Sequence, residues 1–376
     1  MPELAGDRAF LGEDQLELRR TMVAFLGKHV GEAAVRAQVE TSDRFDRAVW
    51  QRMANELGLP ALAVPEHRGG FGATALEVVV VAEELGASLA PQPFFPAVLA
   101  AAGLSAVDGD PSAAVLESIV SGEVVAVVPP VTAVGAVAAG IRARVHGDSV
   151  HLTGRADFVV NGAQANRFLV YTDGPDGALL VALTRGDGVS VGERTCLDST
   201  RSQACLDFDD ATATIIATSR EAEAAWRQAQ RWGQLVLAAG EVGVARRCLE
   251  MSVDYAGVRK QFGRLIGSHQ AIKHRCTDML IALDLARAAV RDTAIAVRDD
   301  RPGVDAAVHQ ARYLAQQAAE FATRECIQVH GGIGFTWEHP AHLYYKRARA
   351  DSVVLGTSTD HLDAFAALTL QTPTES

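Results

Sequence analysis

The chain has few of the features that mark extracellular, metal-binding or nucleic-acid-binding proteins. Its 376 residues include five cysteines, which are scattered and form no Cys-x-x-Cys pair. Reduced thiols are therefore expected, rather than a disulfide framework or a cysteine zinc site. Lys and Arg number 35 against 46 Asp and Glu, which gives a net charge of −11, and no basic run occurs. Nucleic acid and anionic membranes are therefore not expected as partners.

Long apolar runs without helix breakers are also missing. Residues 124–141 carry no charge, but two prolines and two glycines interrupt them, which favours a strand and a loop over a membrane helix. The first ten residues contain charged side chains and lack the apolar region of a signal peptide. We therefore expect a cytoplasmic protein.

Aromatic residues make up only 6% of the chain, whereas alanine is abundant, which favours long, closely packed helices. The residue pattern divides the chain into three zones, expected as domains: 1–120, 121–218 and 219–376. In the first zone, apolar residues at three- and four-residue spacing predict three helices, at Gln15–Val30, Phe45–Leu57 and Ala75–Leu85.

The second zone changes to short β-rich runs, which Gly, Asp and Asn separate, and this pattern predicts a compact antiparallel β domain. The runs are Val124–Val128, Val150–Leu152, Phe158–Val160, Phe168–Tyr171, Leu179–Leu183, Cys205–Phe208 and Thr214–Ala217. The third zone returns to the helical pattern, with helices expected from about 221 to 253, His269 to Arg298 and Val304 to Gln328. Long antiparallel helices of this kind form a bundle.

Two clusters in the last zone combine polar, aromatic and glycine residues. The first reads Arg-Lys-Gln-Phe-Gly at 259–263 and is followed by His269 and Gln270. The second reads Gln-Val-His-Gly-Gly-Ile-Gly-Phe at 328–335. Its three glycines would let the backbone approach an anionic ligand closely, but a glycine turn after a helix is equally a C-cap.

Taken together, the two clusters resemble the acyl-CoA dehydrogenase family, in which Arg-x-x-Phe-Gly with a later Gln, and Gln-x-x-Gly-Gly-x-Gly-Phe, are characteristic. The resemblance extends over nearly the whole chain, through the turn at Val64–Gly72, the loop Phe158–Gly162 and the segment Leu206–Asp210. It implies an α+β fold with an N-terminal helical domain, a middle antiparallel β-barrel and a C-terminal four-helix bundle, assembled as a tetramer or dimer.

The resemblance also implies FAD as cofactor, bound at a subunit interface, and an acyl-CoA as substrate. The bundle of one subunit would hold the ADP half of its neighbour's FAD. The positions that match are Arg259, Gln261, Phe262, Gln270, Gln328, Gly331 and Gly332. Arg231 resembles the family arginine near acyl-CoA, although a charge on a helix surface is an equal explanation. An electron-transferring flavoprotein is the partner that the family implies as electron acceptor.

The catalytic base of the family is missing from both of its expected positions. It is commonly a Glu before a Gly-Thr pair, and here Leu355 precedes Gly356-Thr357, 27 residues after Gln328 (355 − 328). Leucine cannot accept a proton. An alternative base is expected directly after the arginine of the first cluster, and that residue is Lys260. A lysine is normally protonated and needs strong desolvation to act as a base.

The segments expected around the flavin ring depart from the family as well. The loop after the first strand lacks the acidic residue and the serine of the family between Val128 and Gly140, where it has Thr132 and Gly135 instead. The tryptophan and threonine positions of the flavin loop hold Phe158 and Val160, and the latter change removes a hydroxyl donor.

The residues that would hold a neighbour's ADP half are therefore kept, while those that would serve this chain's own flavin ring are changed. This asymmetry predicts the base-lacking subunit of an α₂β₂ complex with a homologous catalytic subunit. It resembles the heteromeric actinobacterial enzymes that act on steroid side-chain CoA thioesters. Two alternatives stay open: a self-sufficient enzyme that uses Asp351 or His330 as base, and a flavin-free scaffold subunit.

Overall fold

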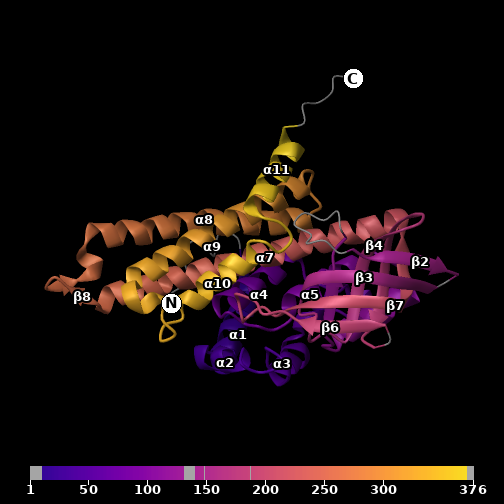
Figure 1. Ribbon diagram of the computed structural model, residues 1–376. Coiled ribbons are helices and arrows are strands. Elements are labelled where there is room, and N and C mark those ends of the chain that lie inside the picture. Colours follow the sequence, from indigo (N-terminus) through magenta and orange to yellow (C-terminus); the bar gives the residue numbers. More distant parts are fainter. Residues whose placement is uncertain (1–10, 131–139, 148, 187, 371–376) are drawn as a thin grey trace. The chain divides into compact units, whose positions relative to one another are not determined.

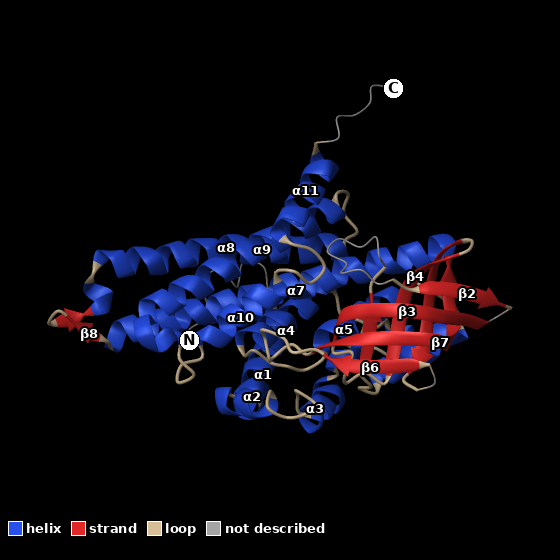
Figure 2. Cartoon of the chain, viewed as in Figure 1, coloured by secondary structure: helices blue, strands red, loops and turns tan. Residues whose placement is uncertain are grey.

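The computed structural model describes residues 11–130, 140–147, 149–186 and 188–370, which form helices and a mixed sheet (Figures 1 and 2). The helices are α1 Glu13–His29, α2 Glu32–Gln38, α3 Arg47–Leu57, α4 Ala75–Ala87, α5 Phe94–Ser105, α6 Asp110–Val120, α7 Ser219–Val258, α8 Gln270–Arg298, α9 Val304–His330, α10 Ala341–Asp351 and α11 Ser358–Thr369. The strands are β1 Val125–Val128, β2 Arg142–His146, β3 Ser149–Val160, β4 Arg167–Gly174, β5 Gly177–Thr184, β6 Val189–Glu193, β7 Gln203–Thr218, β8 Lys260–Gln261 and β9 Arg264–Leu265.

The α+β fold expected from the sequence is confirmed, with N-terminal helices, a middle sheet and C-terminal helices. All six predicted helices are present, and each predicted β run lies within or overlaps a strand. Helices α2, α5, α6, α10 and α11 and strands β2, β6, β8 and β9 were not predicted. The change from helix to strand follows Val120, and the return to helix begins at Ser219. The division into three domains stays a prediction.

By its contacts, the chain forms two compact units. The sheet unit consists of residues 36–74 and 91–233, and the helical unit consists of the residues up to 35, 75–90 and those from 234 onward. Helix α7 contributes its first part to the sheet unit and the rest, from Gln234, to the helical unit.

In the sheet unit, the hydrogen-bonded order of strands is β1-β4-β5-β7-β3-β2, and β6 also pairs with β7. The pairs are antiparallel as expected except for β1 and β4, which run parallel. The uncharged segment that starts this zone contains strand β1, as predicted. In the described part of the chain, no helix is both long and apolar enough to cross a membrane.

In the helical unit, α4 and α7 cross at glycines. A Cβ atom on Gly86 would lie 2.1 Å from the carbonyl oxygen of Gly240, and one on Gly243 would lie 2.0 Å from that of Glu83. Real Cβ atoms do not approach this closely, so the crossing requires glycine at these positions. Helices α8 and α9 pack side by side along the same unit (Figure 1).

Buried charges join the same helices. Glu83 and Glu84 of α4 are buried, and Arg246 of α7 and Arg287 of α8 form ion pairs with them at 2.7–3.3 Å. Burial alone would raise the pKa of Glu83, but the guanidinium groups around it, led by those of Arg287 and Arg246, lower it to about 2. The carboxylate of Glu83 therefore stays ionised in the core of this unit.

Candidate functional site

The two sequence clusters lie next to each other at one end of the helical unit. Ala256 near the end of α7, Ile266 after β9 and Val329 in the last turn of α9 form one buried apolar cluster. The backbone N–H of Ile266 also donates to the carbonyl of Arg259, at 2.9 Å. These contacts hold the 259–263 and 328–335 segments together.

The first cluster forms an exposed hairpin. Lys260 and Gln261 pair with Leu265 and Arg264, and the turn between them places Phe262 and Gly263 at positive φ. The Phe262 side chain is 92% exposed. Its only ring contact among the described residues is with the edge of His269, at 6.2 Å between centroids. A phenylalanine so exposed is available to a ligand or a partner.

The glycine turn serves as a helix cap and also leaves open space. The N–H of Gly331 donates to the carbonyl of Ile327 and closes α9, and Gly331 has a φ of 66°. A Cβ atom on Gly331 or Gly332 would meet no atom within 4 Å. Gln328 is exposed on the preceding turn. The cap expected from the sequence is therefore present, and ligand binding at the same turn stays a prediction.

Contacts between aromatic rings support the end of α9. His330 lies between Tyr255 of α7 and His339, with centroids 4.5 Å and 4.1 Å away. Its Nδ1 atom is 2.8 Å from the carbonyl oxygen of Cys326 and 3.7 Å from its sulfur. A hydrogen bond from Cys248, with a further contribution from His330, lowers the pKa of Cys326 to about 5 although burial opposes this. His330 is thus part of a packed support.

The exposed groups at this end fit the ADP half of a dinucleotide. Arg259 supplies a guanidinium group, which suits phosphate oxygens, and Gln261, Gln270 and Gln328 supply neutral donors and acceptors. All four are exposed, and Gln270 is the first residue of the long helix α8, where free N–H groups favour anions. The open glycine turn leaves room beside them.

The segment expected to carry the base is buried and held by hydrogen bonds, unlike the exposed clusters. Leu355 is 7% exposed and has a φ of 57°, a left-handed conformation that leucine rarely adopts. The loop before it is held by Arg312 of α9, which is fully buried and donates to the carbonyls of Asp351 at 2.6 Å and Val354 at 3.3 Å. After it, Gln316 donates to the carbonyl of Gly356 at 3.0 Å.

Arg312 in turn forms an ion pair with Glu241 of α7, which is also fully buried. Sequence reasoning missed Arg312, Gln316 and Glu241 as determinants of this loop. One signal was present for Glu241, a single carboxylate in the otherwise apolar and small stretch Ala-Ala-Gly-Glu-Val-Gly of α7.

The Leu355 loop and the two clusters lie far apart in the helical unit. Arg312 touches the loop, and Gln328 is 16 residues further along the same helix (328 − 312), so the axial separation is about 24 Å. His330, beside Gln328, therefore lies far from Leu355 within this chain.

Lys260 lies beyond the end of α7, about 25 Å along that helix from Glu241. Its side chain is exposed to solvent, whereas a lysine base needs to be desolvated. Asp351 is the last residue of α10, directly before the loop, and is buried.

The remaining expected residues lie in the sheet unit. Arg231 is half-buried on α7. Phe158 is at a bulge of β3 with a positive φ, and the guanidinium group of Arg194 lies 5.9 Å from its ring. Val160 is buried at the end of β3. Thr132 and Gly135, in the altered loop, lie outside the described residues.

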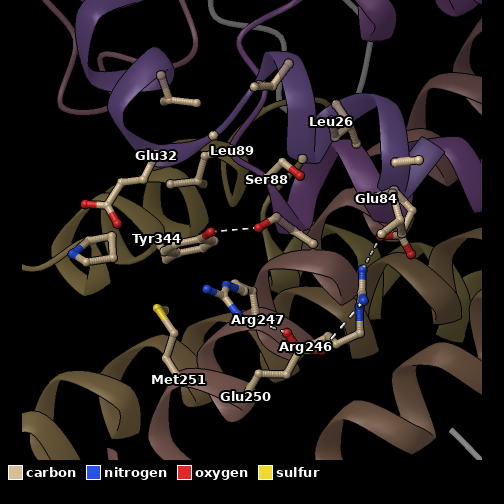
Figure 3. A pocket seen from close by; sticks show the side chains of 18 of the residues that line it. Leu26, Glu32, Glu84, Ser88, Leu89, Arg246, Arg247, Glu250, Met251 and Tyr344 are labelled. Carbon is tan, nitrogen blue, oxygen red and sulfur yellow. Dashed lines mark hydrogen bonds and ion pairs between the residues drawn. The ribbon is translucent and has the colours of Figure 1, made fainter. Parts of the chain in front are cut away.

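A cavity of about 710 Å³ opens elsewhere in the helical unit, between α1, the end of α4, α7 and α10 (Figure 3). Its polar groups pair with one another: Arg246 bonds Glu84 at 2.7 Å, and the Tyr344 hydroxyl donates to the carbonyl of Ala87 at 2.7 Å. None of the residues expected at the site lines it. Its walls come from four separate segments, so no local sequence pattern indicates it.

Comparisons with known proteins identify the family. The family descriptions "Acyl-CoA dehydrogenase, N-terminal domain" and "Acyl-CoA dehydrogenase, C-terminal domain" match residues 12–123 and 225–368. Acyl-CoA dehydrogenase IpdE2 of Mycobacterium tuberculosis is 34% identical over 343 residues, which cover 91% of this chain and 93% of that protein.

Two solved structures share the fold with a TM-score of 0.86 each. One is the ChsE4-ChsE5 complex from Mycobacterium tuberculosis, at 26% identity over 96% of this chain and 99% of the other. The second is a variant of the Tcur3481-Tcur3483 steroid ACAD, at 27% identity over 96% and 98%. Both family domains match in order, and the similarity to IpdE2 covers nearly the full length of that protein. This chain therefore belongs to the acyl-CoA dehydrogenase family, whose members are FAD-dependent oxidoreductases.

Proposed function

We propose that this chain is the base-lacking subunit of a heteromeric acyl-CoA dehydrogenase and supports α,β-dehydrogenation by a homologous catalytic subunit. The observation that carries the proposal is the buried Leu355 at the position of the base, set against the intact, exposed cluster around Arg259 and Gln328. Loss of a positioned base typically costs about 10²–10⁴-fold in rate.

In this proposal, the chain's own residues bind and position the ADP half of the FAD. Arg259 would meet the diphosphate oxygens of the FAD whose ring lies in the partner, with Gln261, Gln270 and Gln328 as neutral hydrogen-bonding groups. Phe262 would cover the bound ADP half, and the turn at Gly331 would admit it. FAD, when bound, supplies the hydride acceptor of the reaction. The α-proton would be removed by a carboxylate of the partner, because Leu355 has no group that can take it.

The substrate is proposed to be a bulky acyl-CoA such as a steroid side-chain thioester. This rests on relatives, since a similar solved structure is described as a steroid ACAD and another as a complex of two different chains. Arg231 as an acyl-CoA contact, an electron-transferring flavoprotein as electron acceptor and a cytoplasmic location stay predictions.

The test is the FAD content per chain, measured by absorbance and native mass, for the chain alone and after co-expression with its genomic neighbours. We expect little flavin in the isolated chain and about one FAD per two chains in a complex with a related partner, as two unlike subunits sharing each site require. One FAD per chain in an active homomer would refute the proposal and favour a self-sufficient enzyme.

Variants of the binding cluster separate the proposal from a flavin-free scaffold. Arg259→Gln and Gln328→Ala, made in the complex, should lower its FAD content and turnover while the subunits stay associated. Unchanged flavin and turnover in both variants would show that the cluster has no redox role. Leu355→Glu in the isolated chain should fail to give full turnover, because the altered loop and Val160 would still leave the flavin ring unsupported.

A further inference from the structure

We propose that Cys248 of α7 and Cys326 of α9 form a redox-active thiol pair, which a hydroperoxide converts into a disulfide. The pair lies within the helical unit and takes part in no step of the proposed dehydrogenation, so its oxidation goes beyond the proposed function. Only the expected effect of the disulfide on bound FAD rests on that function. The two cysteines are 78 residues apart in the sequence (326 − 248), and both are free in the structure.

Small residues let α7 and α9 approach each other closely. Each helix has a line of four small, buried residues at three- and four-residue spacing: Ala245, Cys248, Ser252 and Ala256 on α7, and Ala315, Ala319, Ala322 and Cys326 on α9. Helix axes about 8 Å apart, with Cα atoms about 2.3 Å from each axis, bring facing Cα atoms into the range of roughly 4.4–6.8 Å that a disulfide requires. Helix packing of this kind is therefore compatible with a covalent link.

Contacts on either side of the cysteines hold the two helices in register. Before them along the chain, Glu241 of α7 forms an ion pair with Arg312 of α9, and after them Ala256 of α7 shares an apolar cluster with Val329 of α9. Between these points, the Cys248 thiol donates a hydrogen bond to the sulfur of Cys326, and neither cysteine has exposed surface. The two sulfur atoms are thus in contact before any oxidation.

His330 prepares Cys326 to react. The Nδ1 atom of His330 is 2.8 Å from the carbonyl oxygen of Cys326, a contact that requires a proton on this nitrogen, and 3.7 Å from the sulfur. The hydrogen bond from Cys248 is the main cause of the low pKa of Cys326, and His330 adds to it. The thiolate is the reactive form of cysteine. Two cysteines that only fill space in a core need no such neighbour.

The oxidation proceeds in two steps. The Cys326 thiolate attacks one oxygen of the peroxide, the O–O bond breaks, and Cys326 becomes a sulfenic acid. The hydroxide that leaves, or the alkoxide from an organic peroxide, takes up the proton that Cys326 had lost. The Cys248 sulfur then attacks the sulfenic sulfur, the S–S bond forms, and the hydroxyl group leaves with the Cys248 proton as water. Two electrons pass from the thiols to the peroxide.

The disulfide would alter the support of the binding cluster. Cys326 lies one turn before His330, whose ring packs against those of Tyr255 and His339, and Gly331 follows directly. An S–S bond of about 2.05 Å is shorter than any hydrogen bond between thiols, so oxidation draws the Cys326 sulfur toward α7 and away from His330. The end of α9 moves with it. We therefore expect the complex to bind FAD more weakly after oxidation.

Mass spectrometry of the full chain tests the pair directly. The chain is treated with hydrogen peroxide, the remaining thiols are blocked with N-ethylmaleimide, and the peptides are mapped without reduction. We expect a peptide that links Cys248 to Cys326, which dithiothreitol reverses. Cys205 is an internal control, because it is also buried but has the carboxylate of Asp207 3.5 Å from its sulfur. Burial and this carboxylate raise the pKa of Cys205, so it should react about tenfold or more slowly.

Serine variants separate the roles of the two cysteines. Cys248→Ser should stop the reaction at the sulfenic acid of Cys326, which dimedone traps, whereas Cys326→Ser should leave Cys248 unoxidised. Cys205→Ser, in the sheet unit, is the matched control and should form the link at the parent rate. In the complex, peroxide should lower the FAD content of the parent, dithiothreitol should restore it, and Cys326→Ser should make the complex insensitive.

The outcomes distinguish this inference from the proposed function. A peroxide-treated chain in which Cys248 and Cys326 are both still alkylated would refute the thiol pair, and so would a link from Cys326 to Cys276, the half-buried cysteine of α8. Sulfinic acid at Cys326 without a link would refute Cys248 as its partner. A disulfide that forms in an isolated chain with full flavin would support the thiol pair and refute the proposed function.

Discussion

Replacing Arg312 with methionine should destabilise the chain severely, because Arg312 is the buried link between α7, α9 and the Leu355 loop. Its side chain has no exposed surface, forms an ion pair with the equally buried Glu241, and donates to the carbonyls of Asp351 and Val354. Arg312→Met keeps most of the volume but leaves a buried carboxylate and two carbonyls without this donor.

The expected loss follows from these contacts. Removing one member of a buried ion pair typically costs about 3–5 kcal/mol, and this already includes much of the penalty for the group left behind. The two carbonyls would cost about 1–3 kcal/mol each if counted alone, but they share one donor group with the ion pair, so the terms do not add. We therefore expect a loss of about 3–5 kcal/mol in the free energy of unfolding, a large part of the roughly 5–15 kcal/mol that a domain possesses.

The assay is chemical denaturation followed by tryptophan fluorescence and circular dichroism, with Glu241→Met and the double variant completing a thermodynamic cycle. The double variant removes the buried charge as well as its partner, so it should be more stable than Arg312→Met alone. A loss below about 1 kcal/mol for Arg312→Met, or a double variant as unstable as the sum of the singles, would refute this account of the loop.

Outcomes are also expected for four further variants. Gly243→Ala should destabilise by about 1–3 kcal/mol in thermal unfolding, because its Cβ would lie 2.0 Å from a backbone oxygen of α4. Gly257→Ala, in open space on the same helix, should be neutral or stabilising by up to about 1 kcal/mol. Phe262→Ala should leave the melting temperature of the isolated chain unchanged yet lower the FAD content of the complex, since the side chain is almost fully exposed. Burial, together with the positive charge of Arg312, lowers the pKa of His361 from 6.5 to about 3. The stability that comes from burying neutral His361 is therefore complete above about pH 6.5. It is lost as the pH falls toward 3, because the unfolded chain then binds a proton that the folded chain does not. The pH dependence of unfolding between these values should be flatter in His361→Gln.

The elements that sequence reasoning found are those with a clear period. The ends of α3, α4 and α8 fall within two residues of the expected bounds, because apolar residues recur at three- and four-residue spacing. Helix α5 has no such signal, since residues 94–104 are buried on every side and their sequence is almost uniformly apolar. Strand β2 is mostly exposed and therefore shows no alternation. The runs at Val150–Leu152 and Phe158–Val160 form one strand, β3, interrupted by irregular pairing.

The candidate site was predictable where it depends on short segments and unpredictable where it depends on packing. The exposed residues of the 259–263 hairpin and the 328–335 turn were identified from the two clusters alone. Their adjacency depends on Ile266 meeting Val329, which lie 63 residues apart in the chain (329 − 266). The sequence shows that a leucine occupies position 355, but its left-handed backbone and its fixation by Arg312 have no local signature.

The distance between the two regions gives a physical reason why one could change without the other. The Leu355 loop depends on Arg312, Gln316 and Glu241, and the binding cluster depends on Ala256, Ile266 and Val329, about 24 Å along α9 from the loop. The two sets share no residue, so a substitution in one leaves the packing of the other intact. In a homomer, loss of the base would abolish every site, whereas in a heteromer the partner's base remains and the exposed cluster is still needed. In this chain, the buried residues that support the Leu355 loop and those that support the exposed cluster are both present, but the catalytic base is missing. This combination fits a subunit that contributes binding residues to an active site whose base comes from the partner.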